Sequence, residues 1–454
     1  MKFEDILAAN DKKIQRLSEI AYENDVIDNS LFIKHNVFRG LRDHKGVGVV
    51  TGLTEISEMN GFKLNEEGQR VPMDGVMYYR GLDIHHIIDG MIREDRFGYE
   101  ECAYLLLCGH LPNKKELEEF TNLLNDLRSL PESFARDIIM KAPSKDLMNA
   151  LSRSILTLYS YDENPDDISL KNVFRQSLQL IAVMPLLSVY SYQAYRHYIL
   201  GENLHIRQPK PEFSTAENFL YLLRGTDNYT LEQARLLDIC MVLQAEHGGG
   251  NNSTFTTHVV TSSGTDTYSC ISASLGSLKG PRHGGANLKV VHMMEDIMAN
   301  VKNLTDENIE DYLCKMLEKK VFDQAGLIYG LGHAVYSISD PRALIMREQL
   351  ENYLSDKEKG RLFYLYDRLQ HIAPDVIKKY KNVSNVAINI DYYSGYLYRV
   401  LDIPEQLYTP IFALSRIMGW AAHRFEELAN NGKIIRPAYI AVADRQEYKA
   451  LDER

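Results

Sequence analysis

The stretch Leu278-Lys279-Gly280-Pro281-Arg282-His283-Gly284-Gly285-Ala286-Asn287 bears most directly on the fold and the chemistry of this chain. His283 lies between a Gly-Pro turn and a Gly-Gly pair, so no side chain crowds its ring on either flank. A substrate can therefore approach both the ring and the neighbouring backbone. Taken alone, the pattern is as typical of a loop histidine that contacts a backbone carbonyl.

Apolar residues elsewhere recur mainly at helical spacing. Two such stripes are Leu117, Phe120, Leu124 and Leu127, and Met346, Leu350, Tyr353 and Leu354. Strand-like alternation is confined to residues 47–80, where 48–54 and 75–80 predict a small β-ribbon. Helix ends are predicted at Pro112, Pro185, Pro341, Pro374 and Pro404. We therefore expect an all-α protein with a minor β-ribbon near the N-terminus.

Length and charge restrict the class of protein. A chain of 454 residues exceeds the size at which one core keeps growing, which favours two domains. The formal net charge of −11 gives no electrostatic footprint for nucleic acid or an anionic membrane. The N-terminal residues lack an apolar signal segment, and the longest apolar run, Leu180 to Leu187, is too short to span a bilayer. A cytoplasmic location without a membrane or nucleic-acid partner is expected.

The five cysteines are odd in number and scattered, with no C-x-x-C pair. They predict neither a disulfide framework nor a zinc site. Cys270 has no adjacent histidine or oxyanion-type glycine pattern, which disfavours a nucleophilic role.

Two further segments contain candidate histidines. His247 follows a predicted helix from Leu231 to Gln244 and precedes a glycine-rich turn, although a histidine at a helix C-terminus is also favoured by the helix dipole. His333 lies in Gly330-Leu331-Gly332-His333, shortly before Asp340-Pro341-Arg342. Asp340 and Pro341 predict the start of a helix, and Arg342 in its first turn indicates an anion-binding site unless it is a solvated surface residue.

The last candidate is an acid in apolar and aromatic surroundings. Asp391 lies in Asn389-Ile390-Asp391-Tyr392-Tyr393-Ser394-Gly395. Such surroundings predict a raised pKa, which suits a general base. An aspartate at this position could equally cap the following helix.

Together these residues suit one type of chemistry. A carboxylate removes a proton next to a carbonyl, one neutral imidazole stabilises the enol oxygen, and a second imidazole polarises an acceptor carbonyl. Arginines with spare bidentate capacity can clamp a dicarboxylate; the candidates are Arg342, Arg416 and Arg436.

In the order of these motifs the chain resembles the citrate synthase family. The motifs are His-x-x-x-Asn-x-Ser-Thr, Gly-Pro-x-His-Gly-Gly-Ala-Asn, Gly-x-Gly-His-x-Val-Tyr followed by Asp-Pro-Arg, and Asn-x-Asp-x-Tyr-Ser-Gly, and the likeness covers roughly residues 37 to 445. The resemblance implies a two-domain all-α homodimer with the active site in a cleft between the domains. Residues 1–285 and 396–454 would form the large dimerising domain, and residues 286–395 the small domain.

The resemblance also implies the reaction and its residues. Acetyl-CoA would condense with oxaloacetate to citrate and CoA, a step of the tricarboxylic acid cycle, with acetyl-CoA a substrate and no cofactor or metal required. Asp391 would be the base, His283 would stabilise the enol, and His333 would polarise and protonate the oxaloacetate carbonyl. Oxaloacetate would be held by His247, His333, Arg342, Arg416 and Arg436, the last contributed to the partner subunit's site. Acyl-CoA contacts would come from Arg42, Leu327, Gly330, Gly332 and Asn389.

Some positions depart from the usual family pattern. They are Gln244, Glu246, Gly248 and Arg282, and none of them removes an acid, a base or a clamp. Arg282 places a cation beside His283, which we expect to lower the pKa of that ring.

Three further functions compete with citrate synthesis. A 2-methylcitrate synthase that uses propionyl-CoA is the strongest of them, since one methylene changes discrimination by only about 1–3 kcal/mol. A metal-dependent hydrolase that uses the three histidines and Asp391 is disfavoured because their spacing does not place ligands on one helix face. A non-catalytic CoA-binding relative is disfavoured because every acid–base position is filled.

Overall fold

The computed structural model describes residues 3–43, 46–333, 335–355, 359–381 and 386–454, in two units that divide between Gly52 and Leu53. The first unit contains α1 (Phe3–Asp25), α2 (Asn29–Lys34) and the 3-10 helix η1 (Arg39–Leu41). Asp28 begins α2 by accepting a hydrogen bond from the Ser30 amide. No large hydrophobic side chain is buried in the described part of this unit, and many are exposed on its surface.

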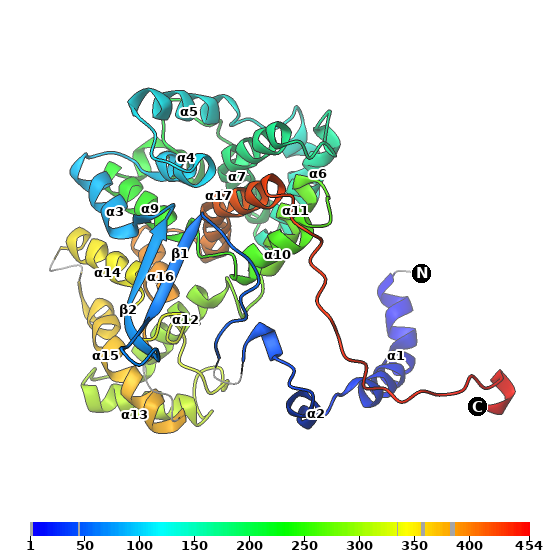
Figure 1. Cartoon of the computed structure of the whole chain (residues 1–454). Coiled ribbons are helices and arrows are strands. Elements are labelled where there is room, and N and C mark those ends of the chain that lie inside the picture. The colour runs from blue at the N-terminus through cyan, green and yellow to red at the C-terminus, as the bar shows by residue number, and fades with distance from the viewer. Residues whose placement is uncertain (1–2, 44–45, 334, 356–358, 382–385) are drawn as a thin grey trace. The chain divides into compact units, whose positions relative to one another are not determined.

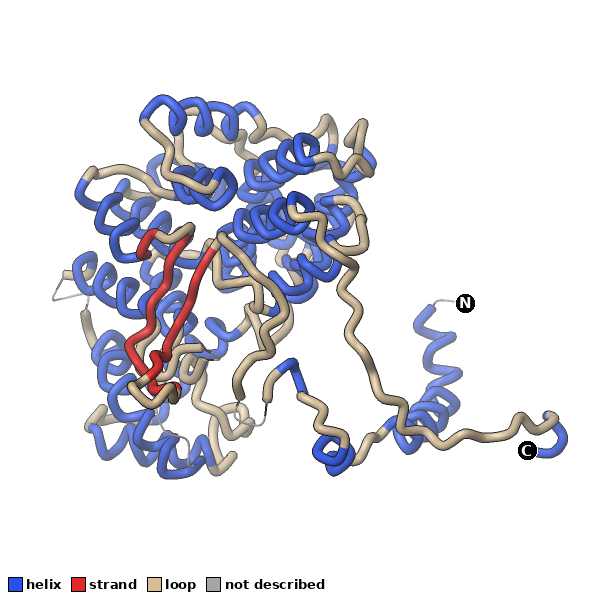
Figure 2. Tube along the Cα trace, in the orientation of Figure 1, coloured by secondary structure: helices blue, strands red, loops and turns tan. Residues whose placement is uncertain are grey.

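The second unit begins with a small antiparallel sheet (Figures 1 and 2). Its strands, in the order β1-β2-β3, are β1 (Ser57–Leu64), β2 (Arg70–Tyr79) and β3 (Leu82–Asp83), and the register pairs Ser57 with Tyr79 and Leu64 with Arg70. The ribbon prediction is confirmed for residues 75–79 and wrong for 48–54. Residues 48–54 are mostly exposed, and Leu53 retains 96% of its surface, so no buried face stabilises strand pairing there.

Helices make up most of the second unit. Their bounds are α3 (Ile84–Arg93), α4 (Tyr99–Cys108), α5 (Lys114–Asp126), α6 (Leu147–Leu158), α7 (Leu170–Tyr198), α8 (Thr215–Arg224), α9 (Leu231–Gln244), α10 (Asn252–Thr261), α11 (Thr267–Leu278), α12 (Ala286–Asn300), α13 (Asp306–Leu317), α14 (Pro341–Tyr353), α15 (Arg361–Lys381), α16 (Ile390–Val400) and α17 (Tyr408–Ala429). Short turns of helix lie at η2 (Ala135–Met140), η3 (Tyr159–Tyr161), η4 (Thr226–Asn228), η5 (Glu405–Leu407) and η6 (Leu451–Glu453). The all-α prediction with a minor sheet is confirmed.

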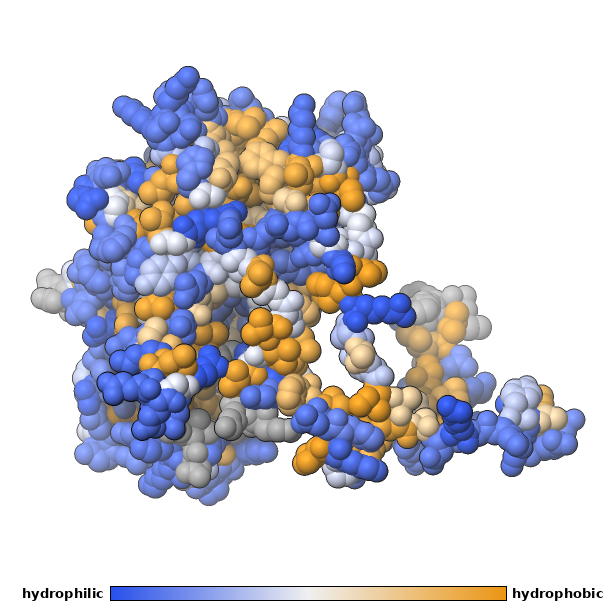
Figure 3. All heavy atoms as spheres, viewed as in Figure 1, coloured by the Kyte–Doolittle hydropathy of each residue, from blue (hydrophilic) through white to orange (hydrophobic). Residues whose placement is uncertain are grey.

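The helix α17 lies at the centre of this unit and packs against α4, α7, α9, α10 and α11 (Figure 1). Trp420, Arg416 and Arg424 on this helix are fully buried. On the face that Figure 3 draws, hydrophilic residues surround scattered apolar patches. Packing on several sides therefore fixes the positions of side chains on α17.

The helix α7 is the one helix in the described residues that is long and apolar enough to cross a membrane by length and composition. Of its most apolar window, 83% is buried inside the protein. Core helices pass the same test, so this finding is weak evidence for a membrane span.

Two of the predicted helix ends are wrong. Pro185 lies inside α7 and Pro374 inside α15. A proline removes one backbone hydrogen bond, and burial of the surrounding turns offsets that loss. Pro341, by contrast, is the first residue of α14, with Asp340 as its N-cap.

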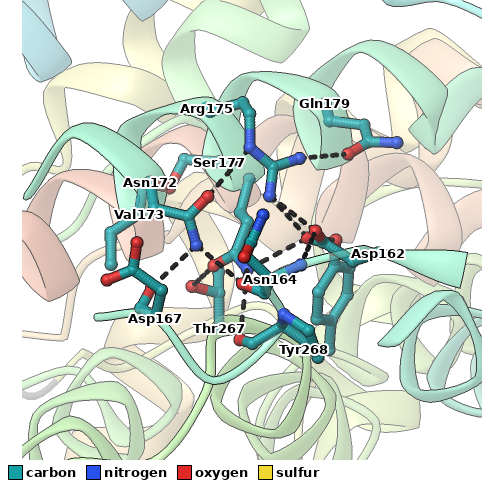
Figure 4. A network of polar contacts seen from close by, with 12 residues as sticks. Asp162, Asn164, Asp167, Asn172, Val173, Arg175, Ser177, Gln179, Thr267 and Tyr268 are labelled. Atoms are coloured by element: carbon teal, nitrogen blue, oxygen red, sulfur yellow. Dashed lines mark hydrogen bonds and ion pairs between the residues drawn. The ribbon is translucent and has the colours of Figure 1, made fainter. Parts of the chain in front are cut away.

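A polar network anchors the loop after η3 to α7 and α11 (Figure 4). Arg175 donates to both carboxylate oxygens of Asp162 at 2.7 Å, and the Tyr268 hydroxyl donates to Asp162 Oδ2 at 2.6 Å. Burial alone would raise the pKa of Asp162, but these hydrogen bonds outweigh burial and lower the pKa to about 2. The carboxylate is thus held ionised between two helices that pack against α17.

Candidate active site

The first element of the site is the C-terminus of α9, which ends at Gln244 as predicted. His247 follows it and is buried, with its ring edge-on to His333 at a centroid distance of 4.9 Å. Burial, and then the charges of Arg342 and neighbouring groups, hold the pKa of His247 well below its usual range. Nε2 of this neutral ring has no hydrogen-bond partner among the described residues. It is therefore available to a ligand.

The structure fixes the tautomer of His333. The backbone amides of Val335 and Tyr336 donate to His333 Nδ1 at 3.0 and 3.2 Å. Since Nδ1 accepts, a neutral ring must have its proton on Nε2. The ring also stacks on Tyr336 at 4.8 Å. His333 is thus oriented as a hydrogen-bond donor through Nε2.

Asp391 lies in the first turn of α16. Asn389 is the N-cap of this helix and accepts from the Asp391 amide at 3.0 Å, so a capping role for Asp391 itself is excluded. Burial raises the pKa of Asp391 to about 7, although the nearby Arg342 opposes the shift. Oδ1 is buried and has no partner in the described chain. A partly buried carboxylate of this kind matches the predicted base.

Backbone hydrogen bonds join the segment before His333 to the start of α16. The Gly332 amide donates to Ala387 O at 2.8 Å, and the Asn389 amide donates to Gly330 O at 2.9 Å. The Asn389 side chain also donates to Gly332 O at 3.0 Å. These contacts tie the loop that presents His333 to the helix that presents Asp391.

His283 lies in the turn between α11 and α12. Its amide donates to Gly280 O at 2.9 Å, and the Gly284 amide donates to Leu278 O at 2.9 Å. A cavity of about 470 Å³ opens beside the ring, lined also by Asn252, Ser277, Gly280, Pro281 and Arg282. The predicted exposure of this histidine to a substrate is consistent with that cavity.

The Nε2 atom of His283 is 3.1 Å from Ser253 Oγ. The Trp420 indole donates to the same oxygen at 3.2 Å, and Asn251 Oδ1 lies 2.9 Å from it. Ser253 has one hydroxyl proton, so it donates either to Asn251 Oδ1, with His283 Nε2 as the donor to Oγ, or to His283 Nε2 itself. Sequence reasoning missed both residues, although Ser253 lies in the Asn-x-Ser-Thr motif and Trp420 is the single tryptophan of the chain.

Burial, followed by the charge of Arg416, lowers the pKa of His283 to about 4. The lowered pKa was predicted, but its assignment to Arg282 was wrong. Arg282 is exposed, where water screens its charge, whereas Arg416 is fully buried. The ring is neutral at physiological pH.

The three candidate arginines differ. Arg342 is buried and donates through Nε and Nη2 to the two oxygens of Asp340, at 3.0 and 2.7 Å, so one of its bidentate faces is already used. Arg416 donates through Nε to Gln244 O at 2.8 Å, and its buried Nη1 has no partner in the described residues. Arg436 is exposed beyond α17, and no hydrogen bond or ion pair among the described residues joins it to the other candidates.

The expected acyl-CoA residues are only partly brought together. Gly330, Gly332 and Asn389 lie in the hydrogen-bonded junction described above, and Leu327, before it, is 45% exposed. Arg42 belongs to the first unit, where it donates to Gly46 O at 2.6 Å. Its role in CoA binding stays a prediction.

Within the described residues, one group of three acids and histidines has ligand atoms close enough for a metal ion: His292, Glu295 and Glu405. None of the predicted site residues belongs to it. Glu295 is also paired with Arg399.

Buried neutral imidazoles, a carboxylate with a raised pKa and two buried arginines define a site for acid–base chemistry on an anionic substrate. The family model described as "Citrate synthase, C-terminal domain" matches residues 45–438. The chain is 34% identical to the citrate synthase of Synechocystis sp. over 84% of this chain and 89% of the relative. It is 30% identical to the 2-methylcitrate synthase of Shewanella oneidensis over 81% of this chain and 89% of the relative.

Structural similarity agrees with these matches. The crystal structure of citrate synthase from Thermotoga maritima superimposes with a TM-score of 0.71 at 30% identity, covering 92% of this chain and 99% of that one. The chain belongs to the citrate synthase family and is an acyltransferase of the type that converts an acyl group into an alkyl group on transfer.

Proposed function

We propose that this enzyme condenses acetyl-CoA with oxaloacetate to give citrate and CoA. The observation that supports this most is the Asp391 carboxyl, whose buried Oδ1 lacks a partner in the described chain and whose pKa is raised to about 7. A base with a pKa near the working pH is well matched to removal of a proton next to a thioester carbonyl.

Each step has a group suited to it. Asp391 takes a methyl proton from acetyl-CoA while neutral His283 donates a hydrogen bond to the thioester oxygen as the enol forms. The enol carbon attacks the oxaloacetate carbonyl, a carbon–carbon bond forms, and the carbonyl oxygen takes the proton from His333 Nε2. Water then hydrolyses the citryl thioester to citrate and CoA. The proton that Asp391 took returns through solvent to His333 Nε2, which restores both groups.

Oxaloacetate binding is assigned to the buried cations and to His247. Arg416 Nη1 and His247 Nε2 are buried without partners in the described chain, so both can bond a dicarboxylate without breaking an existing contact. Arg342 adds positive charge beside them. We assign Arg436 to the site of the partner subunit in a homodimer, and the acyl-CoA contacts to Leu327, Gly330, Gly332, Asn389 and Arg42.

The second candidate is a 2-methylcitrate synthase, because relatives with both names match the chain at similar identity. Thiol release should be measured with acetyl-CoA and propionyl-CoA side by side at saturating oxaloacetate. A higher kcat/KM with acetyl-CoA supports the proposal, and a higher value with propionyl-CoA overturns it in favour of 2-methylcitrate synthesis. Absence of turnover with both thioesters would remove the catalytic assignment.

A further inference from the structure

Four titratable side chains form a continuous row of hydrogen bonds that ends at the residue before His247. Glu427 Oε2 lies 2.8 Å from His258 Nδ1, and His258 Nε2 lies 3.1 Å from His423 Nδ1. His423 Nε2 lies 3.0 Å from Glu246 Oε1. The row joins α10 and α17 to the residue that immediately precedes His247.

With both carboxylates ionised, the hydrogen bonds of this row set the number of protons on its two rings. An ionised carboxylate only accepts, so the nitrogens that face Glu427 and Glu246 must both be protonated. The contact between the two rings needs one further proton, on either His258 Nε2 or His423 Nδ1. Two rings with three protons have one positive charge between them.

The inner end of the row is enclosed. His423 and Glu246 have no exposed surface, and a Cβ on Gly419 would lie 2.3 Å from Glu246 Oε2, so α17 passes directly against this carboxylate. Burial raises the pKa of Glu246, but the charges of His423 and Arg416 lower it to about 2. An ionised Glu246 at this depth needs a positive partner.

Glu246 also holds the turn that contains His247. Its Oε1 atom accepts from the Gly248 amide and, at 3.0 Å, from the Ser57 hydroxyl. The carboxylate thereby bridges the residues on both sides of His247, and it connects this turn to β1.

The outer end of the row reaches solvent. His258 and Glu427 line a cavity of about 1200 Å³, together with Glu55, Arg80 and Glu426. Glu426 also faces His423, since its Oε2 lies 4.0 Å from His423 Nδ1. Among the described residues, the charged and titratable groups nearest the two rings are Glu246, Glu426 and Glu427. Glu55 and Arg80 line the same cavity as His258, and the charge of Arg416 acts on Glu246.

We propose that His258 and His423 share one proton between Glu427 and Glu246, and that this buried imidazolium pair positions His247 for oxaloacetate. In one form, Nδ1 of His423 has the shared proton; in the other, it has moved to Nε2 of His258 and His423 is neutral. Either form keeps Nε2 of His423 as a donor to Glu246. These four are positioning residues, and their effect on binding rests on the proposed function.

The sign of the pH effect follows from the proton count. When the pair loses its shared proton as pH rises, the contact between the rings loses its donor and Glu246 loses its compensating charge. The turn at His247 then loosens, and the KM for oxaloacetate rises, while kcat at saturating substrate stays within about twofold because Asp391 and His283 are unaffected.

The proton count can be measured without any assay of activity. In the full chain with 15N-labelled histidine, the ring nitrogen resonances of the pair are assigned with His258→Gln and His423→Gln. Burial and the charge of His423 lower the pKa of His258, although Glu427 opposes the shift. We therefore expect three bound protons on the two rings at pH 5 and a single shared loss as pH rises. Two protons at pH 5, or two independent titrations, would overturn the proposal whatever the enzyme catalyses.

A kinetic test uses Glu427→Gln, which keeps an acceptor for His258 Nδ1 and removes only the charge. Loss of a nearby negative charge should move the rise in oxaloacetate KM to lower pH by about one unit. The matched control is Glu405→Gln, which changes a half-exposed contact of 3.1 Å to His292 outside the row and should leave the profile unchanged. A Glu427→Gln profile that superimposes on the wild type would contradict the proposal. A wild-type enzyme that makes no citrate would refute the proposed function alone.

Discussion

At the scale of single residues, Asp391 shows how the fold prepares a base at a cost in stability. Its carboxyl has a pKa of about 7 in the folded chain and about 4 in an unfolded one, so the unfolded state loses the proton first as pH rises. Folding stability therefore falls between about pH 4 and pH 7 and stays reduced above it.

Asp391→Asn should remove this penalty along with the base. We expect at least a hundredfold loss of kcat, together with a melting temperature raised by a few degrees at pH 8 and little changed at pH 4. Citrate formation and thermal unfolding at the two pH values measure this. A variant with reduced stability at pH 8, or with kcat within about tenfold of the wild type, would show that Asp391 is a structural residue.

Ser253 is the second residue whose role is local. Its hydroxyl is the one described side-chain partner of His283 Nε2, and this contact orients the imidazole ring. Ser253→Ala should lower kcat about tenfold or more, with the KM for oxaloacetate changed less than threefold. Steady-state kinetics test this, with Ser277→Ala, which lies in the lining of the cavity beside His283, as the control. Equal effects from both changes would argue against a role through His283.

At the scale of elements, close approach at a glycine sets the spacing between two helices of the site. Gly395 shows this on α16, because a Cβ there would lie 2.6 Å from Val291 Cγ2 and 2.9 Å from Asn287 O of α12. This close approach holds the helix that presents Asp391 against the helix that follows His283. The sequence marks the glycine but not the partner helix.

The network around Asp162 offers a stability test at this scale. The pKa of its carboxyl is lowered to about 2, so its contribution is complete above about pH 4 and is lost as pH falls through 2. Asp162→Asn should reduce the free energy of unfolding by about 2 kcal/mol at pH 7. Urea denaturation at pH 7 and pH 3 measures this, and the difference should shrink at the lower pH.

The control for Asp162 is Asp137→Asn. Asp137 pairs with Arg136 at 2.8 Å on the surface, where ion pairs contribute little. A loss of stability as large as that of Asp162→Asn would show that burial of the network is not what matters.

At the scale of the whole molecule, the central question is whether two chains complete each site. Arg436 lies far along the chain from the buried candidates and is exposed. If it serves the partner subunit, Asp391→Ala and Arg436→Ala should each lower activity strongly, while mixed dimers should contain intact sites. In each mixed dimer, one of the two sites has both wild-type residues. Because half of the dimers are mixed when the variants are combined equally, about a quarter of all sites are intact.

The measurement is citrate formation after the two inactive variants are unfolded and refolded together, with dimer formation followed by sedimentation. Recovery to about a quarter of wild-type activity supports the shared site. Activity no greater than that of the separately refolded variants would place Arg436 in its own subunit's site or outside any site. The predicted division into residues 1–285 with 396–454 and 286–395 stays a prediction.

Local signals in the sequence determined the positions of several helices and indicated the family. Helical spacing predicted α5, α9 and α14, because an apolar stripe with a capping residue specifies a helix without knowledge of its neighbours. The motifs around His247, His283, His333 and Asp391 indicated the family for a similar reason, because each motif is a short run of residues that can be read along the chain.

Only the tertiary structure decided the properties that arise between distant segments. Pro185 remains within a helix because packing offsets its missing hydrogen bond, and Arg416 rather than Arg282 acts on His283 because only a buried charge escapes screening by water. The row from Glu427 to Glu246 joins residues more than 160 positions apart. Periodicity and spacing act along the chain, whereas burial and hydrogen bonding depend on which segments meet.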